Sequence, residues 1–183
     1  MQESKIYIAG PEVFLPNADD VLAHNKALCA DYGFIGLSPL DTEIVQSREP
    51  HSPIELAEKI FQANCQLIDE CDIVIANCNP FRLAIVDDGT SFEIGYAFAN
   101  QKLIYGHIRK KKPLPEIVQE RIATGLHKSG YLIDREGYLL NEDFGNTINL
   151  MLEFSILNSG GKLSEGSFED CLRTIVRDLT PEE

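Results

Sequence analysis

Two carboxylates, Asp87 and Glu93, stand six residues apart on either side of a short polar stretch. Asp88, Gly89 and Thr90 lie between them, and Glu93 falls in a run of small and apolar residues that has the spacing of a helix. A turn that contains glycine can fold one carboxylate back toward the other. Two carboxyl groups that face one pocket suit the acid and the nucleophile of a reaction at a glycosidic carbon.

Glu93 also has a purely structural explanation. Thr90 and Glu93 fit the Thr-x-x-Glu capping box, in which Thr90 is the N-cap of a helix over residues 90–100. The two explanations are compatible, because a carboxylate near a helix N-terminus is stabilised as an anion. Both are therefore kept open.

The stretch over residues 87–97 resembles the signature of the nucleoside 2-deoxyribosyltransferases, Asp-x-Gly-Thr-x-Phe-Glu-x-Gly-Tyr-Ala. Three further stretches are similar to the same family and occur in the same order: 5–11 (KIYIAGP), 77–82 (NCNPFR) and 148–152 (INLML). Four separated motifs in one order make the resemblance specific. It covers most of residues 4–157 and leaves the tail beyond about 158 without a counterpart.

The resemblance implies a retaining double displacement on a 2′-deoxynucleoside. Glu93 would attack C1′ and form a covalent 2-deoxyribosyl-enzyme, and Tyr7 in the first strand would hold Glu93 in line. Asp87 would protonate the departing nucleobase and recover a proton from the incoming one, with Asp88 as the alternative acid. Asp88 and Gly89 are also expected to contact the substrate. A buried core tyrosine is the structural alternative for Tyr7.

Three residues elsewhere are candidates for substrate binding. Asn64 would contact the nucleobase edge or the acid, Phe81 would stack on the base, and Asn149 of an adjacent subunit would bind the sugar 5′-hydroxyl. Each also has a structural explanation: a buried amide bonded to a loop or between helices for the asparagines, and simple packing for Phe81. Some family members carry a base-binding aspartate where this chain has Cys65, so that contact is not transferred.

Alternating apolar runs predict how these residues are positioned. Strands are expected at 5–9, 34–37, 72–77 and 103–107, and helices at 19–32, 54–70, 90–100, 146–157 and 168–179, with a shorter helix at 117–126 and a hairpin at 130–140. This order predicts an α/β fold, a doubly wound and mainly parallel five-stranded sheet with helices on both faces, like flavodoxin or the Rossmann fold. Ligands bind such sheets at the carboxyl ends of the strands. No Gly-x-Gly-x-x-Gly follows the first strand, so no dinucleotide, and no other cofactor, is expected.

The domain organisation is expected to be simple. Residues 1–160 form one deoxyribosyltransferase-like domain, and residues 161–183 form a helical extension of it. The polar loop over 38–52 has the length of a functional lid. The helix at 146–157 is apolar nearly all round, which suggests burial against another subunit. A homo-oligomer, with each active site completed by a neighbour, is therefore expected.

Composition excludes several partners. The chain of 183 residues has a net charge of −13, which argues against nucleic acid and against an anionic membrane surface. Five cysteines without Cys-x-x-Cys spacing indicate reduced thiols in the cytoplasm. The N-terminus does not resemble a signal peptide, and four scattered histidines make no metal site.

The expected partners are a 2′-deoxynucleoside and a free nucleobase. Two alternatives to transfer stay open: an N-glycoside hydrolase of 2′-deoxynucleosides or their 5′-monophosphates, and a non-catalytic nucleotide-sensing module. The loop after the first strand, PEVFLPN, offers neither positive charge nor serines, which disfavours a monophosphate.

Overall fold

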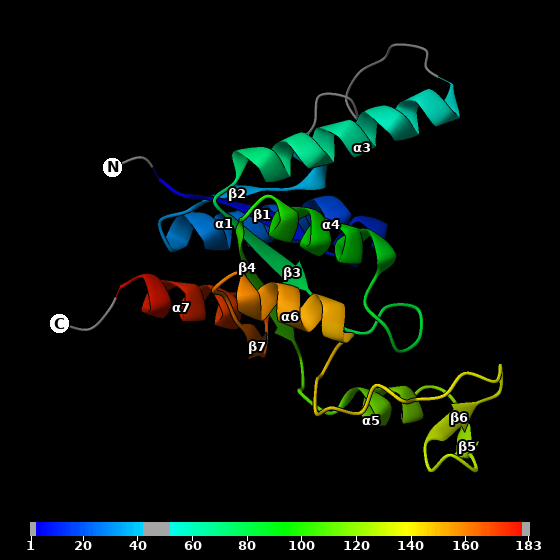
Figure 1. Ribbon diagram of the computed structural model, residues 1–183. Helices are drawn as coiled ribbons and strands as arrows, with labels where there is room; N and C mark the ends of the chain where they lie inside the picture. The colour runs from blue at the N-terminus through cyan, green and yellow to red at the C-terminus, as the bar shows by residue number, and fades with distance from the viewer. Residues whose placement is uncertain (1–2, 42–51, 181–183) are drawn as a thin grey trace.

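The computed structural model describes residues 3–41 and 52–180, and its centre is a parallel sheet in the order β2-β1-β3-β4-β7 (Figure 1). Neighbouring strands all pair in parallel. The inner strands are nearly continuous apolar runs, as expected of parallel strands covered on both faces. The strands are β1 (Lys5–Ala9), β2 (Ile35–Leu37), β3 (Ile73–Asn77), β4 (Leu103–Ile108) and β7 (Leu163–Glu165). This confirms the predicted α/β fold.

Helices cover both faces of the sheet and create two apolar cores. Ile68, Ile94 and Ile156 pack α3, α4 and α6 against one face. Leu22 and Leu172 pack α1 and α7 against the other. The helices are α1 (Ala18–Asp31), α3 (Pro53–Glu70), α4 (Asp88–Ala99), α5 (Leu114–Gln119), α6 (Leu150–Asn158) and α7 (Phe168–Leu179), with 3₁₀ turns η1 (Pro11–Phe14) and η2 (Pro39–Asp41).

Two helix starts differ from the prediction, for one physical reason. Helix α4 begins at Asp88 with Asp87 as its N-cap, so Thr90 is not the cap and the predicted Thr90–Glu93 capping box is wrong. Helix α6 begins at Leu150 rather than at residue 146, with Asn149 as its N-cap. Aspartate and asparagine accept backbone N–H groups at helix starts at least as well as threonine does.

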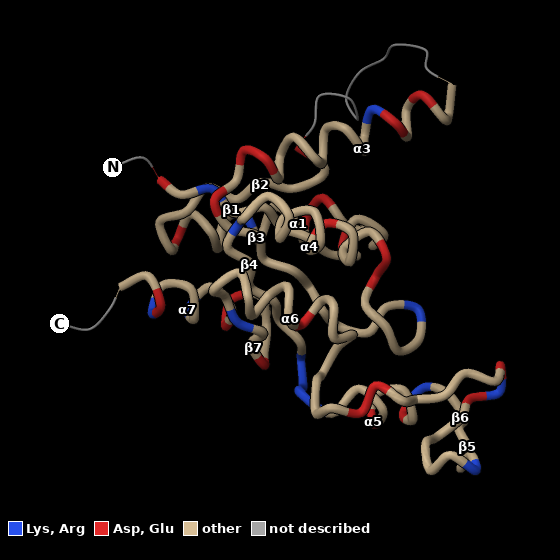
Figure 2. Tube along the Cα trace, in the orientation of Figure 1, with Lys and Arg blue, Asp and Glu red and all other residues tan. Residues whose placement is uncertain are grey.

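The region between β4 and α6 departs furthest from expectation. The helix predicted at 117–126 is wrong: α5 ends at Gln119, and β5 (Thr124–Leu126) pairs with β6 (Leu132–Asp134) in an antiparallel hairpin. The hairpin lies beyond α5, away from the sheet (Figure 1). The basic run 109–112 leads from β4 into α5 (Figure 2). Its charge is partly offset, because Lys112 pairs with Glu120.

The segment after residue 160 contributes a strand to the sheet as well as the predicted helix. Residues 163–165 form β7, which pairs with β4 and supplies the fifth strand that the sequence did not locate. Helix α7 has its predicted bounds. Of the predicted lid over 38–52, η2 is described, whereas residues 42–51 lie outside the described part of the chain. No helix within 3–41 or 52–180 combines the length and the apolar character needed to cross a membrane.

Candidate active site

Strand β1 and helix α4 bring Tyr7 and Glu93 together. The side chain of Tyr7 is fully buried, and its hydroxyl donates a 2.6 Å hydrogen bond to Glu93 Oε1. Glu93 lies in the second turn of α4 and is partly buried. The contact expected between the two residues is therefore present, and a buried phenol fixes the position of one carboxylate oxygen.

Burial dominates the electrostatics of this pair. It raises the pKa of Glu93 from 4.5 to about 7, the Tyr7 hydrogen bond opposes that rise, and the carboxylates of Asp87 and Glu12 add to it. Burial, followed by the charge of Glu93, also raises the pKa of Tyr7 far above its usual value. Tyr7 therefore stays a hydrogen-bond donor, whereas Glu93 is poised between its charged and neutral forms near neutral pH.

Asp87 is buried, with 4% of its surface exposed, and serves as the N-cap of α4. Its Oδ2 accepts hydrogen bonds from Thr90 N at 2.9 Å and Thr90 Oγ1 at 3.1 Å. Its Oδ1 is buried and has no hydrogen-bond partner among the described residues. One oxygen of Asp87 is thus anchored by the helix, and the other is left to interact with a ligand.

A third carboxyl group, Glu12 of η1, joins this cluster. Asn77 Nδ2 donates a 2.6 Å hydrogen bond to Glu12 Oε1, while Glu12 Oε2 is buried without a described partner. Burial raises the pKa of Glu12, the bond from Asn77 opposes that rise, and Asp87 adds to it. Glu12 was not among the site residues predicted from the sequence. Its position just after the first strand, at the carboxyl edge of the sheet, was the available signal.

Two candidates of the Asp87–Thr90 turn lie at the surface. Asp88 and Gly89 are both exposed, and Gly89 N donates a 3.0 Å hydrogen bond to Asp88 Oδ1. Asn64, on α3, is partly buried, and its Oδ1 is buried without a partner in the described parts of the chain. An amide oxygen of this kind is available to a ligand.

Phe81 belongs to a small aromatic cluster. Its ring stacks on Phe14 with centroids 5.5 Å apart and planes inclined by 25°. The guanidinium of Arg82 lies 4.8 Å from the centroid of Phe81 and 5.5 Å from that of Phe14. The side chain of Arg82 therefore makes a cation–π contact with two aromatic rings.

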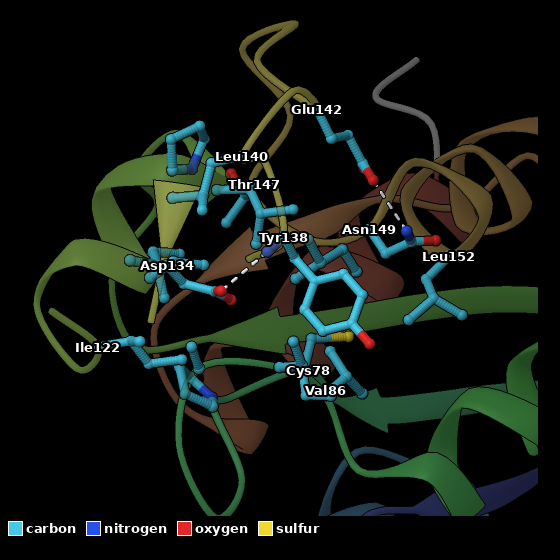
Figure 3. Close-up of a pocket in the computed structure, with 18 of the residues that line it drawn as sticks. Cys78, Val86, Ile122, Asp134, Tyr138, Leu140, Glu142, Thr147, Asn149 and Leu152 are labelled. Carbon is cyan, nitrogen blue, oxygen red and sulfur yellow. Dashed lines mark hydrogen bonds between the residues drawn. The ribbon is translucent and has the colours of Figure 1, made fainter. Parts of the chain in front are cut away.

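Asn149 is not brought to the Tyr7–Glu93 pair. Its side chain accepts from Met151 N at 3.0 Å and donates to Glu142 Oε2 at 2.9 Å. It lines a mainly apolar cavity of about 500 Å³ between α5, α6 and the hairpin. In this cavity the ring of Tyr138 points toward Cys78 and Val86 (Figure 3). Within the described residues, the Asn149 side chain is thus bonded at this cavity and not to Tyr7 or Glu93.

A smaller cavity of about 340 Å³ lies at the carboxyl ends of β3, β4 and β7. It is lined by Glu12, Asn77 and His107, among others. Burial lowers the pKa of His107 to about 4, so this imidazole is neutral at pH 7. Neither cavity is lined by Tyr7, Asp87 or Glu93. Glu12 is thus the link between the second cavity and the carboxyl cluster.

Replacing Glu93 with glutamine should stabilise the protein above pH 7. The pKa of Glu93 is about 7 in the folded chain against 4.5 when unperturbed, so its contribution to stability is complete below about pH 4.5 and is lost as pH rises through about 7. Glutamine does not ionise and can still accept the Tyr7 hydrogen bond. We expect E93Q to raise the free energy of unfolding by roughly 1–3 kcal/mol at pH 8 and to have little effect at pH 4.5. Urea denaturation at both pH values tests this, and equal differences at the two would contradict it.

The chain is similar to several known proteins. A family model described as nucleoside 2-deoxyribosyltransferase matches residues 6–151. The chain is 32% identical over 189 residues to the uncharacterized protein C191.05c of Schizosaccharomyces pombe, covering 95% of this chain and 87% of that protein. It is also similar to the solved structure of a 2-desoxiribosyltransferase from Leishmania mexicana, with a TM-score of 0.66 and 29% identity over 94% of this chain and 97% of that one.

Proposed function

Because the chain belongs to the nucleoside 2-deoxyribosyltransferase family, we propose that it transfers 2-deoxyribose from one nucleobase to another. Nucleosides and nucleobases are the substrates of this family. The observation that best supports transfer is the 2.6 Å hydrogen bond from buried Tyr7 to Glu93, beside the carboxyl group of Asp87. A retaining displacement needs this arrangement of a positioned carboxylate next to a second carboxyl group.

In the first step, Oε2 of Glu93, the oxygen that Tyr7 does not bind, attacks C1′ of the 2′-deoxynucleoside. The bond between C1′ and the base nitrogen breaks, and its electron pair leaves with the base, which takes a proton from Asp87. The products are a free nucleobase and a 2-deoxyribosyl ester of Glu93. An anion beside C1′ stabilises the positive charge that develops on the sugar.

In the second step, a nitrogen of the incoming base attacks the same C1′. The ester bond to Glu93 breaks, the carboxylate is regenerated, and Asp87 accepts the proton that the incoming nitrogen loses. Two inversions at one carbon retain the configuration. Tyr7 holds Oε1 throughout, which keeps the attacking oxygen in line.

A neighbouring subunit is part of this proposal. Apolar side chains of α3, α4 and α6 are left uncovered in the described chain, with exposed fractions of 53% for Phe61, 47% for Phe92, 68% for Met151 and 52% for Phe154. Phe61 and Phe92 are in ring contact at 5.6 Å, so the exposed surface continues from α3 to α4. We propose that a second copy of the chain covers this surface and offers its Asn149 to the sugar.

The thiols support the proposed cytoplasmic location. All five cysteines are unpaired, and four of them are buried. Burial raises the pKa of Cys29 to about 12 and that of Cys71 to about 11, which makes these thiols unreactive. Unpaired cysteines are typical of a reducing compartment.

Incubation with thymidine and adenine tests the proposed function. Transfer produces deoxyadenosine and thymine, hydrolysis would produce free deoxyribose, and a sensing module would produce neither. Mass spectrometry after incubation with thymidine alone should find one 2-deoxyribosyl group on the peptide that contains Glu93. Formation of free deoxyribose without deoxyadenosine would replace transfer with hydrolysis.

Mixing two inactive variants tests whether subunits share active sites. Glu93→Ala and Asn149→Ala should each be nearly inactive alone, because every site lacks one of the two residues. If subunits exchange in a dimer, an equal mixture contains one intact site in four, so roughly a quarter of the original activity should return. Activity is measured after the mixed subunits have been unfolded and refolded together. No recovery, in a mixture shown to contain mixed oligomers, would contradict a shared site.

A further inference from the structure

We propose that Glu12 is a positioning residue of the active site, which sets the pH range over which Glu93 is ionised and able to attack the substrate. The inference rests on the proposed function and goes beyond it, because Glu12 has no part in the two displacement steps. Its carboxyl group is fixed at the same sheet edge as the reacting carboxyls. It acts on them through space rather than by touching the substrate.

The position of Glu12 is specified by contacts from two strands. Asn77, the last residue of β3, binds Oε1 at 2.6 Å and is itself held by Asn79, whose Nδ2 donates to Asn77 Oδ1 at 2.7 Å. Gly10, which follows β1, makes room for the other oxygen: a Cβ there would lie 2.0 Å from Glu12 Oε2. The carboxyl group therefore occupies space that any residue other than glycine at position 10 would fill.

Oε2 of Glu12 is the unusual atom. It is buried without a hydrogen-bond partner among the described residues, and so is Oδ1 of nearby Asp87. A buried carboxylate oxygen without a donor is costly while it is charged. Protonation of Glu12 removes the cost of its buried charge. The three carboxyl groups of Glu12, Asp87 and Glu93 therefore favour keeping a proton among them.

The charged groups around Glu12 determine the direction in which it shifts the pKa of Glu93. In addition to burial, the charge of Asp87 at the start of α4 raises the pKa of Glu12, and the charge of Glu12 raises the pKa of Glu93 within α4. On the opposite side, His107 of β4 and Arg109 line the same small cavity as Glu12. His107 is neutral at pH 7, and no ion pair joins Arg109 to Glu12 within residues 3–41 and 52–180. A negative charge on Glu12 therefore makes ionisation of Glu93 harder.

Glu12→Gln is the test, because glutamine keeps the shape and can accept the Asn77 hydrogen bond. Removing the charge should move the titration of Glu93 down by about one pH unit. The acid limb of the pH profile of kcat/KM, measured with thymidine and adenine, should move by the same amount. At pH 6 the variant should thus be several-fold faster than the unmodified chain, and at pH 8.5 the two should agree.

Two further variants make the result interpretable. Asp20→Asn removes the same charge from an exposed position in the first turn of α1. It should change neither the acid limb of the kcat/KM profile nor the titration of Glu93. Gly10→Ala keeps the charge of Glu12 but displaces its carboxyl group. It should shift the acid limb in the same direction as Glu12→Gln, by a smaller amount. Its backbone is extended at φ 168°, which alanine adopts without strain.

The titration of Glu93 separates this inference from the proposed function. It is followed by carbon NMR of glutamate-labelled protein, with the resonance assigned by its loss in E93Q. If the unmodified chain turns over no deoxynucleoside, the proposed function fails, and the NMR titration still decides the effect of Glu12. An unchanged Glu93 titration in folded E12Q, or a loss of activity equal at every pH, would overturn the inference.

Discussion

Replacing Glu93 with alanine is expected to lower the rate of transfer on the order of 1,000-fold or more, because the reaction loses the atom that bonds to C1′. The fold should survive. Glu93 is a partly buried carboxyl group whose ionised form opposes folding, and its hydrogen-bond partner Tyr7 is a phenol packed in the core. A loss of activity with an unchanged far-ultraviolet spectrum is therefore the expected result.

An added nucleophile sharpens this experiment. The cavity left by Glu93→Ala can admit azide, which attacks C1′ from the side that the carboxylate occupied. With thymidine, one displacement should give a 2-deoxyribosyl azide of inverted configuration, which NMR identifies. Glu58→Ala removes an exposed carboxylate of α3 and should neither lose activity nor respond to azide. Full activity of Glu93→Ala without azide would exclude Glu93 as the nucleophile.

Asp87→Asn is expected to slow transfer from thymidine by roughly 100- to 10,000-fold, because the departing base loses its proton donor. Asparagine can still accept the backbone N–H of Thr90 that Asp87 binds at 2.9 Å, so α4 keeps its N-cap. The loss should depend on the leaving group. A 2-deoxyriboside of nitrophenolate, which leaves without a proton, should form the glycosyl-enzyme nearly as fast with the variant as with the unmodified chain.

Asp88→Asn is the matched control for this prediction. Asp88 is adjacent to Asp87 but exposed, and its Oδ1 accepts a hydrogen bond from Gly89 N. If Asp87 is the acid, Asp88→Asn should retain most of the activity with both substrates. A loss that depends on the leaving group in Asp88→Asn, and not in Asp87→Asn, would transfer the acid role to Asp88.

The sheet could be predicted from the sequence because its inner strands are buried on both faces. Strands β1, β3 and β4 are apolar nearly throughout, and burial of this kind leaves a pattern that does not depend on the rest of the fold. Strand β7 has only three residues, two of them polar, and is a strand because β4 offers it a free edge. A partner supplied by the fold leaves no local signal in the sequence.

The same distinction applies to the carboxyl cluster. Glu93, Asp87 and Tyr7 were found because their spacing resembles a family motif, and the structure joins Tyr7 to Glu93 by a hydrogen bond. Glu12 lies just outside the family motif at residues 5–11. It comes to lie beside Asn77 only because β1 pairs with β3. The start of α6 was predicted too early because Ile148 extends the apolar pattern of the helix beyond Asn149. The side chain of Asn149 caps the helix, which therefore begins at Leu150.

The late position of β7 in the chain affects how the protein can fold during synthesis. Strand β4 is made some 60 residues before the segment that pairs with it, and α7, which fills much of the second core, is made after that segment. Until both have left the ribosome, the edge of β4 stays unpaired and apolar side chains such as Tyr105 stay exposed to solvent. A product that stops before Leu163 should therefore aggregate rather than fold, however complete its catalytic motifs are.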